Sequence, residues 1–386
     1  MFFITILIIL LSTKLAGDLS VRAGQPAVVG KLIIGVIIGP ALLGWIDNSE
    51  MIDELSEIGV LLLMFIAGLE TDLDELKRSF KSSMAVATGG ILLPFAGGYL
   101  VGTWIGMDTP HAIFLGLLLS ATSVSISVQS LKELDMMKSR ESTTILGAAI
   151  IDDIMVVVLL AFVMSIFGGE EVNLALVISK KFLFFIAAGF MIWKGAKWVM
   201  KLLAPLRVTE SVISAGLIVC FFLAFVAEQL GVAGIIGAFA AGLAISQTSY
   251  KEEVEHKLEP IAYAIFVPIF FVSVGFSVSF DGIGDQIGLI AILTIVAILT
   301  KLLGSGLGAR LTGFSTRSSL GIGSGMVSRG EVALIIATIG LESGLLEQEY
   351  FTVLVVVVIF TTLVTPFLLK MVFRDKEVIR GSAEGK

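Results

Sequence analysis

The stretch LGAAIIDDIMVVVLLAF at residues 146–162 places two adjacent carboxylates, Asp152 and Asp153, in the middle of an otherwise apolar run. A bilayer core needs about 20 apolar residues per helical span, so a run of this kind is typical of a membrane-spanning helix. A charged side chain at the centre of such a span costs about 2.5–3.5 kcal/mol and is retained only with a partner or a function. The pair therefore predicts a membrane protein in which buried carboxylates have a charged partner or a function.

The composition of the whole chain agrees with this prediction. Of its 386 residues 56% are hydrophobic, only 15% are charged and 41 are glycine, and the mean hydropathy is +1.00. That leaves too little polar surface for a soluble fold and excludes a disordered chain. The net charge of -7 argues against binding nucleic acid, and one cysteine, Cys220, cannot form a disulfide scaffold. No nucleophile has a base beside it, so we do not expect an enzyme.

Apolar runs separated by charged or turn-rich interruptions predict an all-α polytopic membrane protein with about 13 transmembrane helices. The first run lacks a positive n-region and is interpreted as a retained span rather than a secretory signal. The predicted segments are 1–20, 27–45, 55–70, 82–105, 110–130, 143–167, 181–200, 209–228, 231–247, 259–279, 286–309, 318–340 and 350–372.

The positions of Lys and Arg predict the orientation of the chain. Of these 26 residues, 21 fall in loops after odd-numbered segments or in the C-terminal tail. Loops after even-numbered segments hold only Lys180 and Lys181, and the stretch DNSEMIDE at 47–54 has only acidic charges. Cytoplasmic loops hold the excess of positive charge. We therefore expect the N-terminus outside and the C-terminus in the cytoplasm, in a plasma membrane that we take for a bacterial inner membrane.

An internal repeat appears when the sequence is shifted by 207 residues. Gly30, Gly35, Gly68 and Gly116 then fall on glycines 237, 242, 275 and 323. Segments 2, 3 and 5 thereby match segments 9, 10 and 12, and a displacement of seven spans turns the second half upside down. Inverted repeats of this kind are common in secondary transporters, whose sites lie between the halves at mid-membrane. The alternative is that small residues merely allow close helix packing.

Lys301, in segment 11, is the most plausible partner for the aspartate pair. It lies about nine residues from the cytoplasmic end of its span, about 13 Å in a helix, which is far for a lysine to reach the interface by snorkelling. Adjacent helical residues point about 100° apart, so Asp152 and Asp153 cannot face the same surface. The interpretation is that Lys301 pairs with Asp152, which neutralises two buried charges together, while the other carboxylate faces a water-filled cavity. The alternative is a pair of protonated carboxylic acids in a packed interior.

Two spans carry signs of an interruption. Segment 5 contains the hydroxyl run SATSVSIS at 120–127, which includes Ser120, Thr122 and Ser123, and segment 12 has glycines at 321, 323, 325 and 330. Unwound backbone and hydroxyl groups offer hard oxygen ligands that suit an alkali cation, and the chain has no Cys/His cluster for a transition metal. Arg329 and Glu331 are expected to pair with each other or with freed helix ends. The alternative for the hydroxyls is bonding to the preceding helical turn.

Four other ionisable residues receive no role from the sequence. Glu70 and Glu228 lie at segment ends, where solvation is a sufficient explanation, and His111 and His256 are placed in loops.

Together these residues resemble the monovalent cation:proton antiporter-2 family, specifically its NapA-type sodium/proton antiporters. The resemblance covers essentially the whole chain. It rests on QPAVVGKLIIGVIIGPALLG at 25–44, FIAGLETDL at 65–73, the SATSVSIS run, the IIDDI pair at 150–154, TKLLGSGLGA at 300–309 and SRGEVAL at 328–334.

The resemblance implies the sodium/proton antiporter fold, with two inverted-topology repeats, crossed unwound helices and a homodimer. It implies a dimerisation domain (1–80 and 209–280), a core ion-transport domain (81–168 and 285–373), a linking helix (169–208) and a short cytoplasmic tail (374–386). Asp153 is expected to carry the cation and the proton, with Asp152 as its partner bonded to Lys301. Thr122 and Ser123 are expected to add ligands in the unwound stretch, and Ser120, Arg329 and Glu331 to support the core.

The expected activity is exchange of a monovalent cation, Na+ or Li+, for protons, with no cofactor and with elevator-type movement of the core. The resemblance favours an electrogenic exchange. An electroneutral K+/H+ or Na+/H+ antiporter remains an alternative, although both aspartates and the short tail disfavour the glutathione-gated potassium efflux subgroup. A cation channel and an organic-anion symporter are more distant alternatives.

Overall fold

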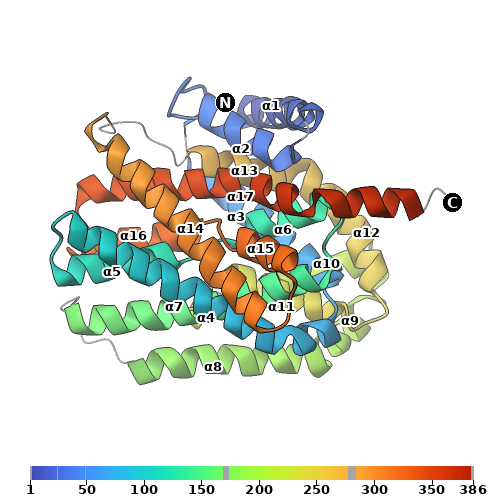
Figure 1. Cartoon of the computed structure of the whole chain (residues 1–386). Coiled ribbons are helices and arrows are strands. Elements are labelled where there is room, and N and C mark those ends of the chain that lie inside the picture. Colours follow the sequence, from blue (N-terminus) through green and yellow to red (C-terminus); the bar gives the residue numbers. More distant parts are fainter. Residues whose placement is uncertain (1, 24, 48, 168–173, 277–283, 384–386) are drawn as a thin grey trace.

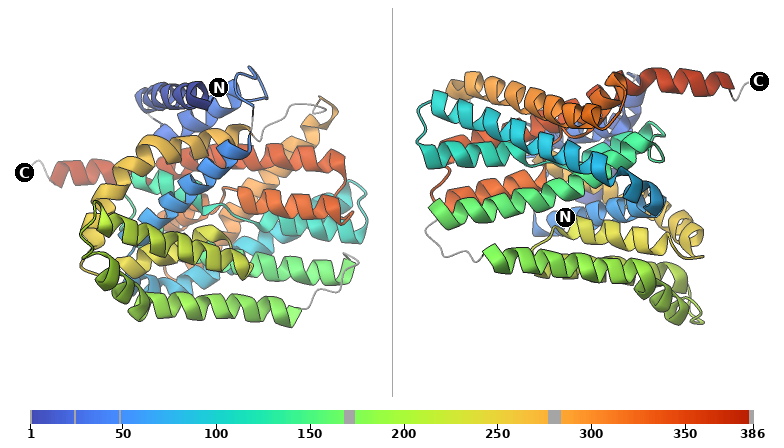
Figure 2. Two further views of the ribbon diagram at one scale, coloured as in Figure 1. Left: turned by 180° about the vertical axis from the view of Figure 1, so that it is seen from behind. Right: turned by 60° about the horizontal axis from the view of Figure 1, so that its bottom comes forward.

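The computed structural model describes residues 2–23, 25–47, 49–167, 174–276 and 284–383 (Figure 1). Every element in this part of the chain is a helix, and no strand occurs in it. Most helices run along one shared direction, as spans of a single membrane do (Figures 1 and 2).

The N-terminal half consists of seven α-helices. They are α1 (Phe2–Arg22), α2 (Ala27–Ile38), α3 (Glu50–Glu70), α4 (Leu73–Trp104), α5 (Thr109–Ser120), α6 (Val124–Glu133) and α7 (Arg140–Phe167). The C-terminal half consists of α10 (Ser211–Gln229), α11 (Gly234–Ile245), α12 (Lys251–Ile261), α13 (Val267–Phe276), α14 (Ile287–Leu311), α15 (Thr316–Gly325), α16 (Glu331–Glu342) and α17 (Gln348–Ala383).

Between the halves lies a linking segment made of α8 (Leu174–Phe190) and α9 (Ala196–Leu203). A short π-helical turn, η1 (Met191–Gly195), joins them, a second one, η2 (Ala262–Phe266), joins α12 to α13, and a 3₁₀ turn, η3 (Gly284–Gln286), precedes α14. Helix α8 runs along the edge of the bundle beside α7 (Figure 1).

The helices reproduce the 207-residue repeat. Shifted by 207, Ala27–Ile38 falls on Gly234–Ile245, so α2 and α11 have the same bounds, and Thr109 and Val124 fall on the first residues of α15 and α16. Gly30 packs directly on the backbone of α1 and its mate Gly237 on that of α10, and a Cβ at either position would overlap a carbonyl oxygen. The glycines thus allow close packing, and they do so at equivalent places in both halves.

Each of the thirteen predicted segments falls on helix. Within the described residues nine helices are long and apolar enough to cross a membrane, and they coincide with segments 1, 4, 5, 6, 7, 8, 10, 11 and 13. The other four segments fall on the short helices α2 and α11, on α3, whose first half is acidic, and on the broken pair α15–α16. The number that crosses the membrane stays a prediction. Residues 168–173 and 277–283, which include the end of segment 10 and the start of the linking helix, lie outside the described part.

Segments 5 and 12 are interrupted, as the sequence predicts. Helix α5 ends at Ser120, Ala121 and Ser123 take extended backbone angles, and α6 begins at Val124. In the second half the helix ends at Gly325 and resumes at Glu331. The breaks cross in contact: the Ser123 N–H donates to the Ser328 carbonyl at 2.8 Å, and the Ser328 hydroxyl donates to the Ser123 carbonyl at 2.5 Å. Each break thereby satisfies backbone groups that the other frees.

Candidate ion-binding site

The centre of the molecule holds a fully buried ion pair. The ammonium of Lys301 (α14) lies 3.0 Å from Oδ1 of Asp152 (α7), and both side chains are 0% exposed. The ammonium also donates to the carbonyl of Ser120, the last residue of α5, at 2.6 Å. Lys301 therefore does not snorkel to the interface. It pairs with Asp152, as the sequence predicts, and it also connects this carboxylate to the first helix break, which the sequence does not predict.

Arg329 caps the end of the same broken helix. Its fully buried guanidinium donates to the Leu119 carbonyl (2.6 Å from Nη2), to the Ala297 carbonyl at 3.1 Å and to the Val327 carbonyl at 2.6 Å. The last carbonyls of α5 have no helical partner and carry the negative end of the helix dipole. Lys301 and Arg329 supply the hydrogen bonds and the positive charge that these carbonyls need. The side chain of Glu331 lies outside the described part of the structure, so its predicted pairing with Arg329 stays a prediction.

Asp153 lies on a different face of α7 from Asp152 and is slightly more exposed, at 9% against 0%. Its carboxylate lies within electrostatic range of the ammonium groups of Lys301 and Lys181. The sequence assigns Lys181 to a loop, and this is wrong: it lies within α8 and its side chain is 4% exposed. The one sign in the sequence that Lys181 belongs to a helix is that predicted segment 7 begins at residue 181.

Several buried oxygen atoms at the ion pair and along the run that holds the first helix break have no hydrogen-bond partner. Among the described side chains, the buried atoms without a partner include Oδ2 of Asp152, Oγ1 of Thr122 and Oγ of Ser125. The Thr122 hydroxyl faces the Asp152 carboxylate without normal hydrogen-bond geometry. Buried polar atoms are rarely left without a partner, since each costs about 1–3 kcal/mol. A bound alkali cation would satisfy hard oxygen atoms of this kind.

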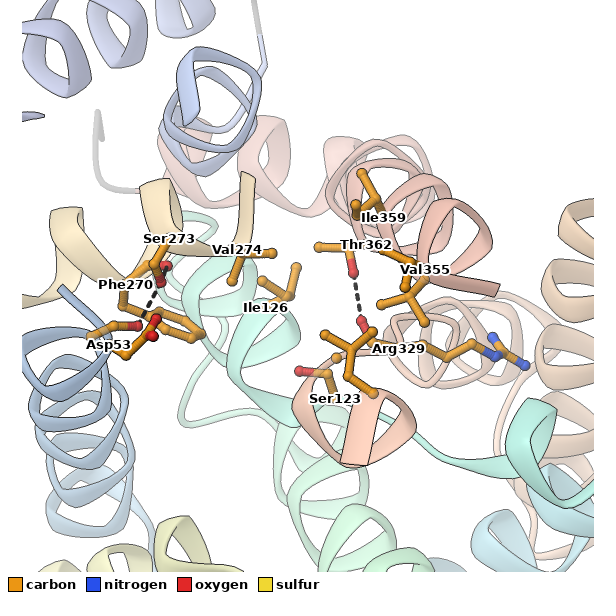
Figure 3. Close-up of a pocket in the computed structure, with 14 residues that line it drawn as sticks. Asp53, Ser123, Ile126, Phe270, Ser273, Val274, Arg329, Val355, Ile359 and Thr362 are labelled. Carbon is orange, nitrogen blue, oxygen red and sulfur yellow. Dashed lines mark hydrogen bonds between the residues drawn. The ribbon is translucent and has the colours of Figure 1, made fainter. Parts of the chain in front are cut away.

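Ser123 lines a cavity beside the first helix break. The cavity has a volume of about 150 Å³ and lies between α3 and α13 on one side and α6, α16 and α17 on the other (Figure 3). Asp53 and Ser273 stand at one wall and Ser123 and Thr362 at the other, while the guanidinium of Arg329 points away from it (Figure 3). The Thr362 hydroxyl donates to the Arg329 carbonyl at 2.5 Å and so fixes the second break. The sequence alone did not single out Asp53, Ser273 or Thr362.

A second charged cluster joins different helices near the ends of α3 and α6. The ammonium of Lys132 (α6) lies 2.6 Å from Glu70 (α3) and 2.8 Å from Glu259 (α12) and sits over the ring of Tyr263. The interpretation of Glu70 as simply solvated is therefore wrong, since its side chain is 13% exposed and paired. Lys132, Glu259 and Tyr263 border a hollow of about 550 Å³. His256 also lines it and lies within α12 rather than in a loop.

His111 and Glu228, which receive no role from the sequence, lie in different surroundings. His111 lies in the first turn of α5 rather than in a loop, and its ring and backbone N–H bond to Asp108, which holds the pKa of that carboxyl below its usual range. Glu228 is exposed, in agreement with the sequence. No group of three or more His, Cys, Asp or Glu side chains that could hold a metal ion occurs among the described residues.

Known proteins are similar to this chain over nearly its full length. The family described as sodium/hydrogen exchanger, transmembrane, matches residues 4–375. The Na+/H+-K+ antiporter GerN of Bacillus cereus is 64% identical over 376 residues, covering 97% of each chain. A Na+/H+ antiporter of Enterococcus hirae is 45% identical and covers 94% of this chain and 96% of its own. The sodium proton antiporter MjNhaP1 of Methanocaldococcus jannaschii superposes with a TM-score of 0.72 at 16% identity, covering 97% and 96%.

Two repeats whose broken helices cross beside buried carboxylates define a membrane protein with the sodium/proton antiporter fold. The family match over residues 4–375 and the identities of 64% and 45% with relatives show to which family the chain belongs. It belongs to the sodium/hydrogen exchanger family, which confirms the family resemblance seen in the sequence.

Proposed function

We propose that the chain is a secondary antiporter that exchanges a monovalent cation, preferentially Na+, for protons across the cell membrane. The observation that carries the proposal is the arrangement of Asp152 and Asp153 at the crossed breaks, with Lys301 bound to the first of them at 3.0 Å. A carboxylate that binds either a cation or a proton couples the two fluxes, because both cannot occupy it together. The relatives from Bacillus cereus and Enterococcus hirae, named as Na+/H+ antiporters, support this assignment.

Asp153 is proposed as the carrier and Asp152 as the second ligand. Oδ2 of Asp152 and Oγ1 of Thr122 are buried and lack donors, so they are available to a cation held by Asp153. Ser123 is the last residue of the first break, directly before α6, and lines the cavity, where it is suited to contact an arriving cation. Ser120, Arg329 and Glu331 are proposed to hold the breaks rather than to bind the ion.

The charge at the site distinguishes two exchange schemes. If Lys301 keeps its proton throughout, the sodium form and the protonated form are both neutral, and exchange is one for one. If the cation draws Asp152 away from Lys301, a buried ammonium is left without its carboxylate, which is costly enough to expel its proton. Two protons then exchange for one cation, and transport responds to the membrane potential. We propose the second scheme, because Lys301 is 0% exposed and Asp152 is its one carboxylate partner within 4 Å among the described side chains.

Alternating access is proposed to occur by movement of a core domain (81–168 and 285–373) against a dimerisation domain (1–80 and 209–280). Packing supports this division, since α4 packs on α5, α7 and α14, whereas α3 packs on α11 and α13. The 150 Å³ cavity and the Lys132 cluster both lie between the two groups. A moving core would have to break the ion pairs of Lys132.

The homodimer and the orientation are proposed on different grounds. Dimerisation through residues 1–80 and 209–280 rests on the family resemblance, and α1 offers an exposed apolar ridge that includes Leu7, Leu11 and Leu15. An outer N-terminus and a cytoplasmic C-terminus rest on the distribution of Lys and Arg.

Potassium is the second candidate substrate. The relative with 64% identity is named a Na+/H+-K+ antiporter. A K+/H+ or Na+/H+ exchange without net charge transfer would use the first charge scheme.

The proposal is tested by cation-driven proton movement in proteoliposomes. Na+, Li+ and K+ gradients are compared for the wild type and for Asp153→Asn, with and without an imposed membrane potential. We expect Na+-dependent, potential-sensitive exchange that the variant abolishes. Cation flux that survives in the variant without proton coupling would instead identify a channel, and potential-independent exchange with K+ alone would select the electroneutral alternative.

A further inference from the structure

Lys181 is a buried cation that the proposed exchange cycle does not use. It lies on α8, its side chain is 4% exposed, and α8 packs against α7, α10 and α11. A lysine in this setting carries a desolvation cost that needs compensation. Among the described side chains no carboxylate lies within 4.0 Å of its ammonium, so an ordinary ion pair does not supply it.

A backbone carbonyl in the turn between two other helices holds the Lys181 ammonium in place. The ammonium donates a short hydrogen bond to the carbonyl of Gly231, in the turn between α10 and α11. That turn lies within the proposed dimerisation domain. The linking helix therefore holds a positive charge that is fastened to the part of the molecule proposed to stay fixed.

Among the described residues, Asp153 on α7, the helix that packs against α8, lies within electrostatic range of this ammonium. Asp152 differs, since it has Lys301 as its hydrogen-bonded partner. Both adjacent carboxylates interact with Lys301 of the proposed core, Asp152 by direct contact and Asp153 through space. Asp153 also experiences the field of Lys181, a lysine bound to the opposite domain.

We propose that Lys181 is an affinity-setting residue: fixed to Gly231, it holds a positive charge near Asp153 that weakens the binding of the transported cation. This rests on the proposed role of Asp153 as the carrier. A fixed charge that repels the cation keeps the site from retaining it, which an exchanger requires for release. Lys181 does not itself touch the cation.

The test measures the apparent KM for Na+ and the maximal rate of exchange in proteoliposomes, at a pH high enough that the KM no longer falls as the pH rises. For an assumed separation of about 10 Å and an effective dielectric constant of about 20 to 40, one unit charge changes the binding constant of another about 4- to 16-fold. We expect Lys181→Gln to lower the KM for Na+ by about that factor. Lys181→Arg, which keeps the charge and the donor, should retain the wild-type KM.

Lys180→Gln is the matched control, because it removes the same charge from an adjacent exposed position. Lys181→Met serves as a second neutral variant if Lys181→Gln does not fold. If Lys181 had only a structural role, its replacement would lower the maximal rate or raise the KM. Lys181→Arg and Lys181→Gln would then have the same KM. An unchanged or raised KM in the folded neutral variants, or an equal shift in Lys180→Gln, overturns the proposal.

Asp153→Asn in the same assay separates the two proposals. Exchange that persists in Asp153→Asn refutes the proposed carrier. Exchange that is lost there, together with an unchanged KM in Lys181→Gln, refutes only the role of Lys181.

Discussion

Lys301 and Lys132 both pair with carboxylates, but in opposite surroundings. Lys301 and Asp152 are 0% exposed, and both sit on helices of the proposed core. Lys132, Glu70 and Glu259 are 19%, 13% and 40% exposed, and their pairs join the proposed core to the proposed dimerisation domain. A sealed pair is costly to break because water cannot replace the lost partner, whereas a partly wet pair is exchanged for hydration at little cost. The first arrangement suits a pair that separates only when a bound cation replaces Lys301 at Asp152, and the second suits a contact that opens and closes with the movement of the domains.

The largest effect on stability is expected from breaking the sealed pair on one side only. Asp152→Asn leaves the Lys301 ammonium buried without its carboxylate, and losses of this kind are about 3–5 kcal/mol. The measurement is the free energy of unfolding in mixed detergent micelles. Asp152→Asn combined with Lys301→Met should recover most of the loss, since no uncompensated charge remains. Equal destabilisation in the single and double variants would refute the idea that an unpaired charge is the cause.

A smaller effect on folding, but a clear effect on transport, is expected from the boundary cluster. Lys132→Gln should change the free energy of unfolding by less than about 1 kcal/mol. If the pairs with Glu70 and Glu259 must open in each cycle, the maximal exchange rate should rise, by about two- to fivefold for a barrier lowered by about 0.4–1 kcal/mol. The exposed Lys138 provides the control variant Lys138→Gln. An unchanged rate would show that these pairs do not limit the movement.

A change of ionic strength can separate the partly exposed pairs of Lys132 from the buried pair of Lys301 without a substitution. Raising choline chloride from about 0.05 to about 0.5 M shortens the range of charge interactions in water to a few ångströms but hardly reaches buried pairs. We expect the exchange rate of the wild type to rise toward that of Lys132→Gln and that of the variant to stay constant. A similar response of both proteins to salt would locate the effect elsewhere.

The smallest effect concerns a fully wet carboxylate. Asp72 caps α4 by accepting from the backbone N–H groups of Glu75 (3.2 Å) and Asp74 (2.8 Å), which hold its pKa below the usual range. Asp72→Ala should cost about 1 kcal/mol at neutral pH. Because the pKa is lowered in the folded state, this contribution is present above the ordinary pKa and is lost as the pH falls through the lowered one. Unfolding titrations of both proteins should therefore converge in acid, and a constant difference would exclude the carboxylate as the cause.

The sequence predicted those features of the fold that follow from polarity and spacing. The apolar runs located the helices, and the hydroxyl run at 120–127 and the glycines near 321–330 located the two breaks. The cost of buried charge is sufficient to predict Asp152 and Lys301 as partners. The 207-residue offset of glycines predicted a repeat that the helix bounds of α2 and α11 reproduce.

The features that the sequence missed depend on which distant residues meet. Lys181 and Glu70 look like residues at the end of a span, where solvation is the default, and only the packing of α8 on α10 and of α3 on α6 shows that they are covered. Thr362 is one of several threonines in an apolar helix until its hydroxyl is seen on the carbonyl of Arg329. Side-chain direction around a helix and helix register decide such contacts, and neither is determined by composition.

The central claim is that cation and proton compete for one site at Asp153. It is tested most directly by measuring the protons released when Na+ binds to the purified protein, by calorimetry in two buffers of different ionisation enthalpy. The electrogenic scheme predicts the release of more than one and up to two protons per Na+, and no binding heat in Asp153→Asn. Binding of Na+ to the wild type without proton release would contradict the claim.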